Sequence, residues 1–133
     1  MEKQILKRFT MNVDHTNPDA KVTFTSVGTG KTQKEAVIFA LGMFYRIMSG
    51  HEAEEGDEIN NYEDSLEIVN NHLADIEDID TVVNSLIEGT IEKNSDIFYN
   101  SYEDTEVDYE FSEIENVSEG GYISKLVVIE PEY

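Results

Sequence analysis

The chain contains no cysteine and no tryptophan, and only 2 of its 133 residues are proline. The absence of cysteine excludes disulfide scaffolds, zinc sites with cysteine ligands and thiol nucleophiles. Basic residues are also scarce, with 9 Lys and Arg against 29 Asp and Glu, for a net charge of −20. We therefore expect no direct binding to nucleic acid or to an anionic membrane, because both need a basic surface.

Long apolar segments are also missing. The longest run, residues 36–45, is too short to span a bilayer, which takes about 20 residues. The first residues, MEKQILKRF, lack the apolar core of a signal peptide. Hydrophobic residues still make up 39% of the chain, as is ordinary for a globular protein. We expect one domain over residues 1–133, located in the cytoplasm.

The charge is distributed unevenly. Residues 1–50 hold seven Lys and Arg and four Asp and Glu, and are therefore slightly basic. Residues 51–133 hold two Lys and Arg and 25 Asp and Glu. So strong a field destabilises a compact fold and exceeds the net charge of about 2–8 that solubility needs. A basic binding partner is the interpretation that we favour for the surplus.

Periodicity predicts helices and strands along the whole chain. Thr32 and Glu35 have the spacing of a capping box, and so place the start of a largely apolar helix. Asn60 or Asn61 is expected to cap the second helix, and Asp80 the third. The expected helices cover residues 33–48, 62–75 and 81–88, and the expected strands cover residues 5–13, 21–27, 106–117 and 122–129.

These elements predict an α+β fold of order ββααββ, in which an antiparallel sheet with hairpins at both ends of the chain surrounds a buried central helix. Glycines in residues 28–30 are expected to end the second strand, and residues 119–121 to form the last turn. A bulge near Ser112 and Glu113 would turn Ile114 inward, beside Val107 and Phe111. The apolar residues 126–129 predict a strand that is central in the sheet or covered on both faces.

Catalytic and cofactor motifs are incomplete. Residues 28–32, GTGKT, follow a strand and precede a helix, as in a phosphate loop, but Thr25 stands where the loop needs glycine. The acids of residues 75–80 lack the glycine and the terminal Glu of a calcium loop. His15, His51 and His72 have no zinc-ligand spacing. We therefore expect no catalytic residue, no cofactor and no metal.

The acids of the second half have the spacing of a binding surface. Glu106, Asp108 and Glu110 alternate along a strand, and would form a row with carboxylates about 6.6–6.8 Å apart, comparable to successive phosphates of a nucleic acid. Tyrosines lie among these acids, and aromatic residues often anchor interfaces. The predicted partner-binding residues are Glu52, Glu54, Glu55, Asp57, Glu58, Glu63, Asp64, Tyr99, Tyr102, Glu103, Asp104, Glu106, Asp108, Tyr109, Glu110, Glu113 and Glu115.

In its acidic clusters over residues 51–64, 75–80 and 103–115, the chain resembles the small acidic inhibitors of phages and mobile elements. These include anti-CRISPR proteins and anti-restriction proteins that mimic DNA. The resemblance implies an inhibitor that fills the cationic channel of a host defence nuclease, such as a Cas9-type effector. In that case the carboxylates would pair with arginines of the channel.

Other functions stay open at this point. An immunity protein for a basic nuclease toxin would use the same charges. A structural or regulatory protein would carry its acids for solvation alone, and a phosphate-loop enzyme would depend on Lys31. The basic residues of the first third could also bind the acid-rich half of a second copy and form a homodimer.

Overall fold

The fold is a five-stranded antiparallel sheet covered by helices, with the element order ββαβααββ. The computed structural model describes residues 5–16, 21–49, 56–74, 76–92, 95–98, 104–115 and 119–129. The elements are β1 (Ile5–Thr16), β2 (Lys21–Gly30), α1 (Gln33–Met48), β3 (Glu58–Ile59), α2 (Tyr62–Leu73), α3 (Ile79–Glu88), a 3-10 turn (Asp96–Phe98), β4 (Asp104–Glu115) and β5 (Gly120–Ile129). The predicted α+β class is confirmed.

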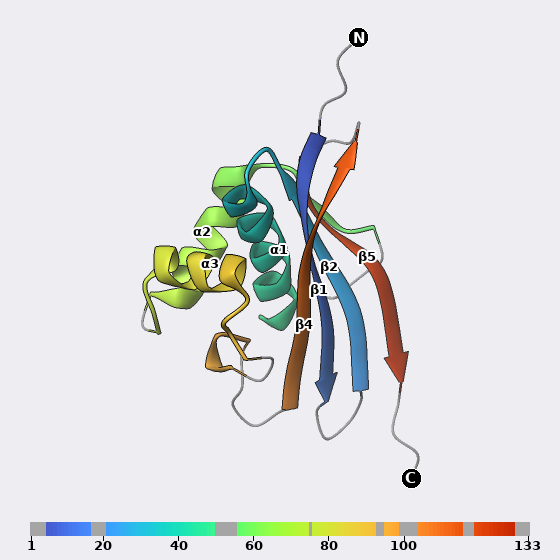
Figure 1. Cartoon of the computed structure of the whole chain (residues 1–133). Coiled ribbons are helices and arrows are strands. Elements are labelled where there is room, and N and C mark those ends of the chain that lie inside the picture. The colour runs from blue at the N-terminus through green and yellow to red at the C-terminus, as the bar shows by residue number, and fades with distance from the viewer. Residues whose placement is uncertain are drawn as a thin grey trace.

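The helices and the sheet form layers. The strands are ordered β3-β5-β2-β1-β4, so β4 and the short β3 are the two edges of the described sheet. All three helices lie on the same side of the sheet (Figure 1). Helix α1 packs on β1, β2 and β5, and α2 and α3 pack on α1. No helix of the described residues lies on the opposite side of the sheet.

Helix α1 lies at the centre of the domain because its sequence is apolar on nearly every side. Its predicted bounds are confirmed, and the capping box is present: the backbone N–H of Glu35 donates to Thr32 Oγ1 at 3.1 Å. Ten consecutive residues, 36–45, are buried. A helix buried on several sides needs packing partners on several sides, and the sheet, α2 and α3 supply them.

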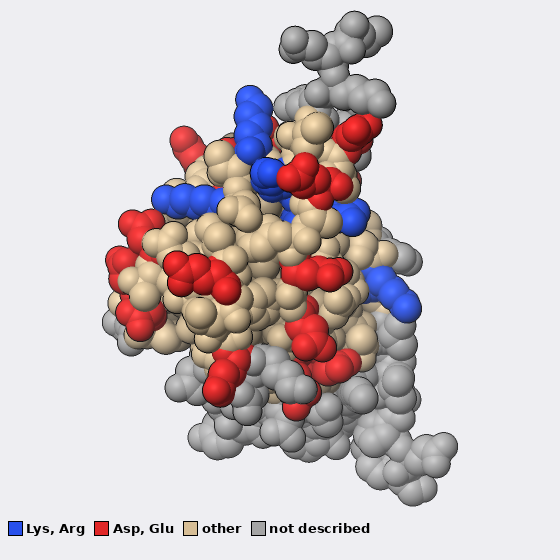
Figure 2. Space-filling model, viewed as in Figure 1, with Lys and Arg blue, Asp and Glu red and all other residues tan. Residues whose placement is uncertain are grey.

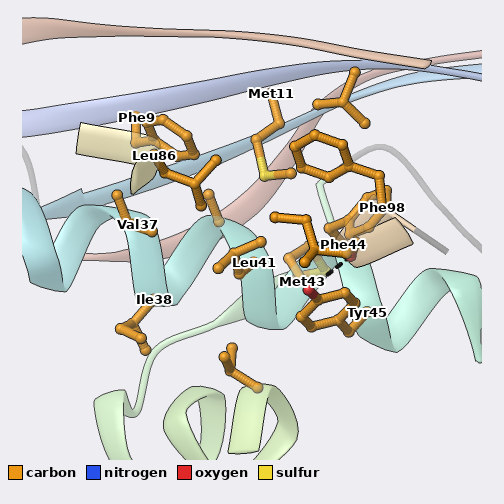
Figure 3. Close-up of a cluster of buried hydrophobic side chains, with 14 of the residues drawn as sticks. Phe9, Met11, Val37, Ile38, Leu41, Met43, Phe44, Tyr45, Leu86 and Phe98 are labelled. Atoms are coloured by element: carbon orange, nitrogen blue, oxygen red, sulfur yellow. Dashed lines mark hydrogen bonds between the residues drawn. The ribbon is translucent and has the colours of Figure 1, made fainter. Parts of the chain in front are cut away.

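The main core lies between α1 and the sheet (Figure 3). Phe9 and Met11 from β1 meet Leu41 and Phe44 from α1, and all four are at most 1% exposed. The Tyr45 hydroxyl donates to the Ile97 carbonyl oxygen at 2.8 Å, which satisfies a buried polar group and ties the 3-10 turn to α1. The core thus joins the first third of the chain to elements that follow it much later.

Two glycine segments that the sequence analysis assigned to turns belong instead to strands. Strand β2 continues through Gly28 and Gly30, and β5 begins at Gly120. A Cβ on Gly28 would lie 1.9 Å from the Ala36 carbonyl oxygen, and one on Gly121 would lie 2.6 Å from that of Phe39. These glycines therefore allow the backbone of α1 to approach the sheet closely. The prediction of a strand break and a final turn was wrong for this reason.

The predicted hairpin at the C-terminal end is also not formed. β1 and β2 pair as expected, but β4 pairs with β1, and β5 pairs with β2 and β3. The two late strands thus flank the first hairpin, one on each side. Gly120 and Gly121 extend the pairing of β5 with β2 up to Thr29. At Gly121 the strand also packs closely against α1. Among the described residues, 126–129 pair with β2 alone, because β3 pairs with β5 only at Gly121 and Tyr122, so the central position predicted for residues 126–129 is not confirmed.

Candidate functional site: an acidic face of the sheet

The side of the sheet opposite α1, called the outer face here, carries polar side chains. Phe9, Met11 and Val13 of β1 are buried on the helix side, so the alternate residues Asn12 and Asp14 point to the outer face. Both of these are exposed. Among the side chains that the structure describes, β1 and β4 expose the following on the outer face: Asn12, Asp14, Glu106, Asp108 and Glu110.

Three of these residues, Glu106, Asp108 and Glu110, form the acid row. They alternate along β4, and the buried Val107 between them confirms that they share the outer face. Alternate residues of a strand are about 6.8 Å apart, so the row is regular. Asp14 lies directly opposite Glu106 in the ladder and adds a fourth carboxylate. The structure thus places acids from the first and last thirds of the chain together.

Two side-chain hydrogen bonds join β1 to β2 on the outer face. Thr25 Oγ1 donates to Asn12 Oδ1 at 2.9 Å, and Thr23 Oγ1 donates to Asp14 Oδ1 at 2.9 Å. Toward the start of β1, Leu6 is 0% exposed. The exposed acids that β1 and β4 place on the outer face therefore lie toward the end of β1 and the start of β4.

Two acids predicted to extend the row do not lie in it. The pairing of β4 with β1 is continuous from Thr16↔Asp104 to Ile5↔Glu115, so the bulge predicted near Ser112 is absent. Ile114 consequently shares the outer face with the row, opposite the buried Leu6. Glu113 and Glu115 point to the other side of the sheet, where Glu113 Oε1 accepts from Lys7 Nζ at 2.7 Å. Because Leu6 gives Ile114 an apolar partner on the outer face, β4 keeps its two-residue alternation and needs no bulge.

Tyr109 also lies on the helix side. Its hydroxyl donates to the Ile91 carbonyl oxygen at 2.8 Å and accepts from the Ile91 backbone N–H at 3.1 Å. Burial raises the pKa of Tyr109, while the hydrogen bond to Ile91 acts to lower it. Its ring lies 5.6 Å from Phe9 and 6.2 Å from Phe98, between ring centroids. Tyr109 therefore anchors β4 to the core, and only part of its side chain is exposed to solvent.

Several predicted site residues are not described. Glu52, Glu54, Glu55, Tyr99, Tyr102 and Glu103 lie outside the described residues, and only the backbone of Asp104 is described. Their predicted role in partner binding stays a prediction.

The other described acids of the first cluster lie near the opposite edge of the sheet from the row. Glu63 and Asp64 occupy the first turn of α2, where their backbone N–H groups donate to Asn61 Oδ1. Acids there are stabilised by the helix dipole, so these two have a local structural role. Asp57 immediately precedes β3, and Glu58 Oε2 accepts from Asn60 Nδ2 at 3.2 Å.

A groove of about 750 Å³ lies between the end of α1, β3 and α2. It is lined by Glu58 and Asp64 and also by Arg46, Ser49 and His72. Arg46 places a positive charge in the groove, which distinguishes the groove from the acid row. The described acids of residues 56–64 are thus not continuous with the row.

In the groove, two residues 23 positions apart meet in a way that no sequence spacing indicates. Ser49 Oγ lies 2.9 Å from His72 Nε2, and the His72 ring stacks on Tyr45 with centroids 4.7 Å apart. Ser49 Oγ also donates to the Tyr45 carbonyl oxygen at 2.7 Å, so its hydroxyl caps the end of α1. Within the described part of the chain, no group of three His, Asp or Glu side chains could hold a metal ion.

The residues of the incomplete phosphate loop have structural positions. Gly28 and Gly30 lie in β2 beneath α1, and a Cβ on Gly30 would approach Glu35 Cβ to 2.5 Å. The Glu35 carboxylate stands in the first turn of α1, where a phosphate would have to bind. Lys31 Nζ lies 3.9 Å from Glu119 Oε1. A close helix–sheet contact and a capped helix thus account for this motif.

The two signs of charge are unevenly distributed on the face seen in Figure 2. Most blue Lys and Arg side chains lie toward the end of the molecule where β1 begins, with several red ones among them, whereas red Asp and Glu side chains predominate along the course of β4 and are scattered over the helical layer. Lys7, Lys31 and Lys34 lie within 4 Å of the carboxylates of Glu113, Glu119 and Asp80, respectively. These cations are therefore partly neutralised by local acids, while the acid row stays exposed.

Comparison of the chain with known families, with curated proteins and with solved structures found no match. Among the described residues, no helix has both the length and the apolar character needed to cross a membrane.

Proposed function

We propose that this protein is an acidic inhibitor that binds the basic nucleic-acid-binding surface of a nuclease, as a DNA-mimicking anti-CRISPR protein acting on a Cas9-type effector. The observation that carries the proposal is the exposed acid row on a helix-free face of the sheet, with Asp14 beside it. In this proposal the protein works in the host cytoplasm and needs neither a catalytic residue nor a cofactor.

The physical basis is electrostatic substitution. A nuclease channel that holds nucleic acid is lined by Arg and Lys, and carboxylates at a regular spacing of about 6.8 Å can occupy positions that phosphates would take. Arginine binds carboxylates in a bidentate manner, which adds geometric selectivity to the charge. Opposite fields also accelerate the encounter, and this acceleration decreases with salt.

The rigid support of the row favours a binding role. Val107 and Phe9 are buried beneath it, and β4 pairs with β1 along its full length. A row held by a sheet loses little conformational freedom when it binds, so more of the interaction energy becomes affinity.

The test is a cleavage assay with a panel of purified Cas9-type nucleases and guide RNA, with this protein titrated in. We expect inhibition that weakens as salt rises and that is relieved by excess target duplex. The triple variant Glu106→Lys, Asp108→Lys, Glu110→Lys should lose inhibition by at least about 100-fold and still fold, since two or three charge pairs at about 1.5–3 kcal/mol each are reversed.

The matched control is Glu67→Lys, Glu77→Lys, Glu88→Lys, which makes the same change in net charge at exposed positions of the helical layer. It should inhibit nearly as well as the wild type. If the triple variant of the acid row inhibits as well as the wild type, the row is not the mimic. If no nuclease in the panel is inhibited, capture of a basic toxin by the wild type would favour the immunity-protein alternative.

A further inference from the structure

Strand β4 is a sheet edge of 12 residues, and within the described residues its only hydrogen-bonded neighbour is β1. An edge strand presents backbone N–H and C=O groups to which another extended segment can pair. At the opposite edge β3 has two residues, and the end of β5 beyond it has β2 as its only described neighbour, over a shorter length than β4. In Figure 2 acidic side chains follow the course of β4.

The two sides of this edge differ in chemistry. The outer side bears the acid row, Glu106, Asp108 and Glu110. The helix side bears Tyr109 and Phe111, both of which pack against the core and are only partly buried. An added strand would therefore meet carboxylates on one side and aromatic rings on the other, in a two-residue alternation.

The edge is held in place before any partner arrives. Phe111 lies 4.8 Å from Phe9 between ring centroids, and Val107 is 0% exposed. The bonds of the Tyr109 hydroxyl to the backbone of Ile91 fix the strand from the helix side. Such preorganisation lowers the entropic cost of pairing.

Charge selects the occupant. If two copies of the chain paired through β4 about a two-fold axis at Asp108, that residue would face Asp108 of the second copy and Glu106 would face its Glu110; with the axis at Tyr109, Asp108 would face Glu110. Like charges placed directly opposite each other are destabilising. A segment with Lys or Arg at alternate positions would instead place a cation beside each carboxylate.

We propose that the edge of β4 opposite β1 binds an extended segment of the target in which Lys or Arg alternates with apolar residues, added as a sixth antiparallel strand. The inference rests on the proposed function and specifies how part of the basic partner is held. Charges on an edge strand can also serve only to prevent aggregation, and the experiment separates that role from docking.

The probe is the peptide Ac-KVKLKVK-NH2, together with two N-methylated forms. One form carries N-methyl groups on the second, third and fourth Lys residues, and the other on the three apolar residues. In a strand the N–H groups of alternate residues point to opposite edges, so only one form loses the N–H groups that face β4. Both forms keep the charge and the side chains of the parent peptide.

Binding is measured by titration at low salt up to 1 mM peptide, with amide hydrogen exchange of the full-length protein followed by NMR. We expect one N-methylated form to bind at least tenfold more weakly than the other, and the parent peptide to slow exchange along β4 at least tenfold. Equal binding of both N-methylated forms, or no binding of the parent, overturns the inference.

The variant Glu106→Lys, Asp108→Lys, Glu110→Lys separates this outcome from failure of the proposed function. If both N-methylated forms bind the wild type equally and neither binds the variant, the acid row attracts cations without strand pairing; the proposed function then stands and the docking mode falls. If the variant binds the parent peptide as well as the wild type, the acid row itself has no binding role.

Discussion

Asp14 on β1 and Glu106 on β4 lie directly opposite each other in the antiparallel ladder, with both side chains on the outer face of the sheet. Two like charges in this arrangement oppose the pairing of the strands that carry them. Asp108 and Glu110 follow Glu106 along the same strand and add to the repulsion. We therefore expect the outer face to hold its acids at a cost in folding stability, as binding surfaces often do.

Removing the row should stabilise the protein. The variant Glu106→Gln, Asp108→Asn, Glu110→Gln keeps the shape of the side chains, and we expect its free energy of unfolding to rise by about 0.5–1.5 kcal/mol at low salt. Urea unfolding at 50 mM and 500 mM NaCl checks this, because salt screens the repulsion and should narrow the difference. A less stable variant would mean that these carboxylates make favourable contacts in the folded state.

The elements with strong local signals were predictable. The bounds of α1 were predicted correctly because the Thr32–Glu35 capping box and a continuous apolar segment coincide there. The third helix starts earlier than predicted, because Asp78 rather than Asp80 is its cap and accepts from the Thr81 backbone N–H at 3.2 Å. Helix caps of this kind can be recognised in the sequence, so the start of a helix is predicted to within about one turn.

The strand pairing and part of the site could not be predicted, because they depend on contacts between distant residues. Glycine is typical of turns, and only the close approach of the α1 backbone explains why Gly28 and Gly121 lie in strands. The acid row was predicted from its alternation, but Asp14 joins it only through the β1–β4 pairing. The contact of Ser49 with His72 likewise has no signal in the sequence.

The close packing of α1 on the sheet makes Gly28 intolerant of any side chain. We expect Gly28→Ala to lower the free energy of unfolding by more than about 3 kcal/mol, because its Cβ would lie 1.9 Å from the Ala36 carbonyl oxygen and the helix would have to move. Urea unfolding measures the loss, or circular dichroism shows failure to fold.

Gly89→Ala is the control for that change. Gly89 caps α3 with a φ of 73°, and an added Cβ would meet nothing within 4 Å. Its replacement should therefore cost only about 1 kcal/mol, from the left-handed backbone alone. Similar losses at the two positions would contradict the close-packing explanation.

The buried hydroxyl of Tyr45 predicts a loss of stability at alkaline pH. Burial raises the pKa of Tyr45 above its ordinary value of 10 in the folded state. Below pH 10 both folded and unfolded chains hold the proton. Above pH 10 the unfolded chain releases it while the folded chain keeps it, so stability falls by up to about 1.4 kcal/mol per pH unit.

The variant Tyr45→Phe isolates this contribution. At pH 7 it should be less stable than the wild type by about 1 kcal/mol, because the Ile97 carbonyl oxygen loses its 2.8 Å hydrogen bond. Urea unfolding between pH 8 and 11.5 should show that this gap narrows above pH 10, since the variant has no phenol to ionise at this position. Parallel stability curves for the two proteins would show that Tyr45 does not titrate on unfolding in this range.

The two hydrogen bonds of the Tyr109 hydroxyl predict a local role at the β4 edge. In Tyr109→Phe the backbone N–H and C=O of Ile91 lose their partner, and we expect the free energy of unfolding to fall by about 1–2 kcal/mol. Hydrogen exchange of the Ile91 amide should accelerate at least tenfold, while that of the fully buried Val107 should change only as much as global stability does. Tyr122→Phe is the control, because Tyr122 is a half-buried strand residue with no side-chain hydrogen bond identified among the described residues. If Tyr109→Phe leaves both stability and Ile91 exchange unchanged, the hydroxyl does not fix the edge of the sheet. In that case it also does not preorganise β4 for the docking of a strand.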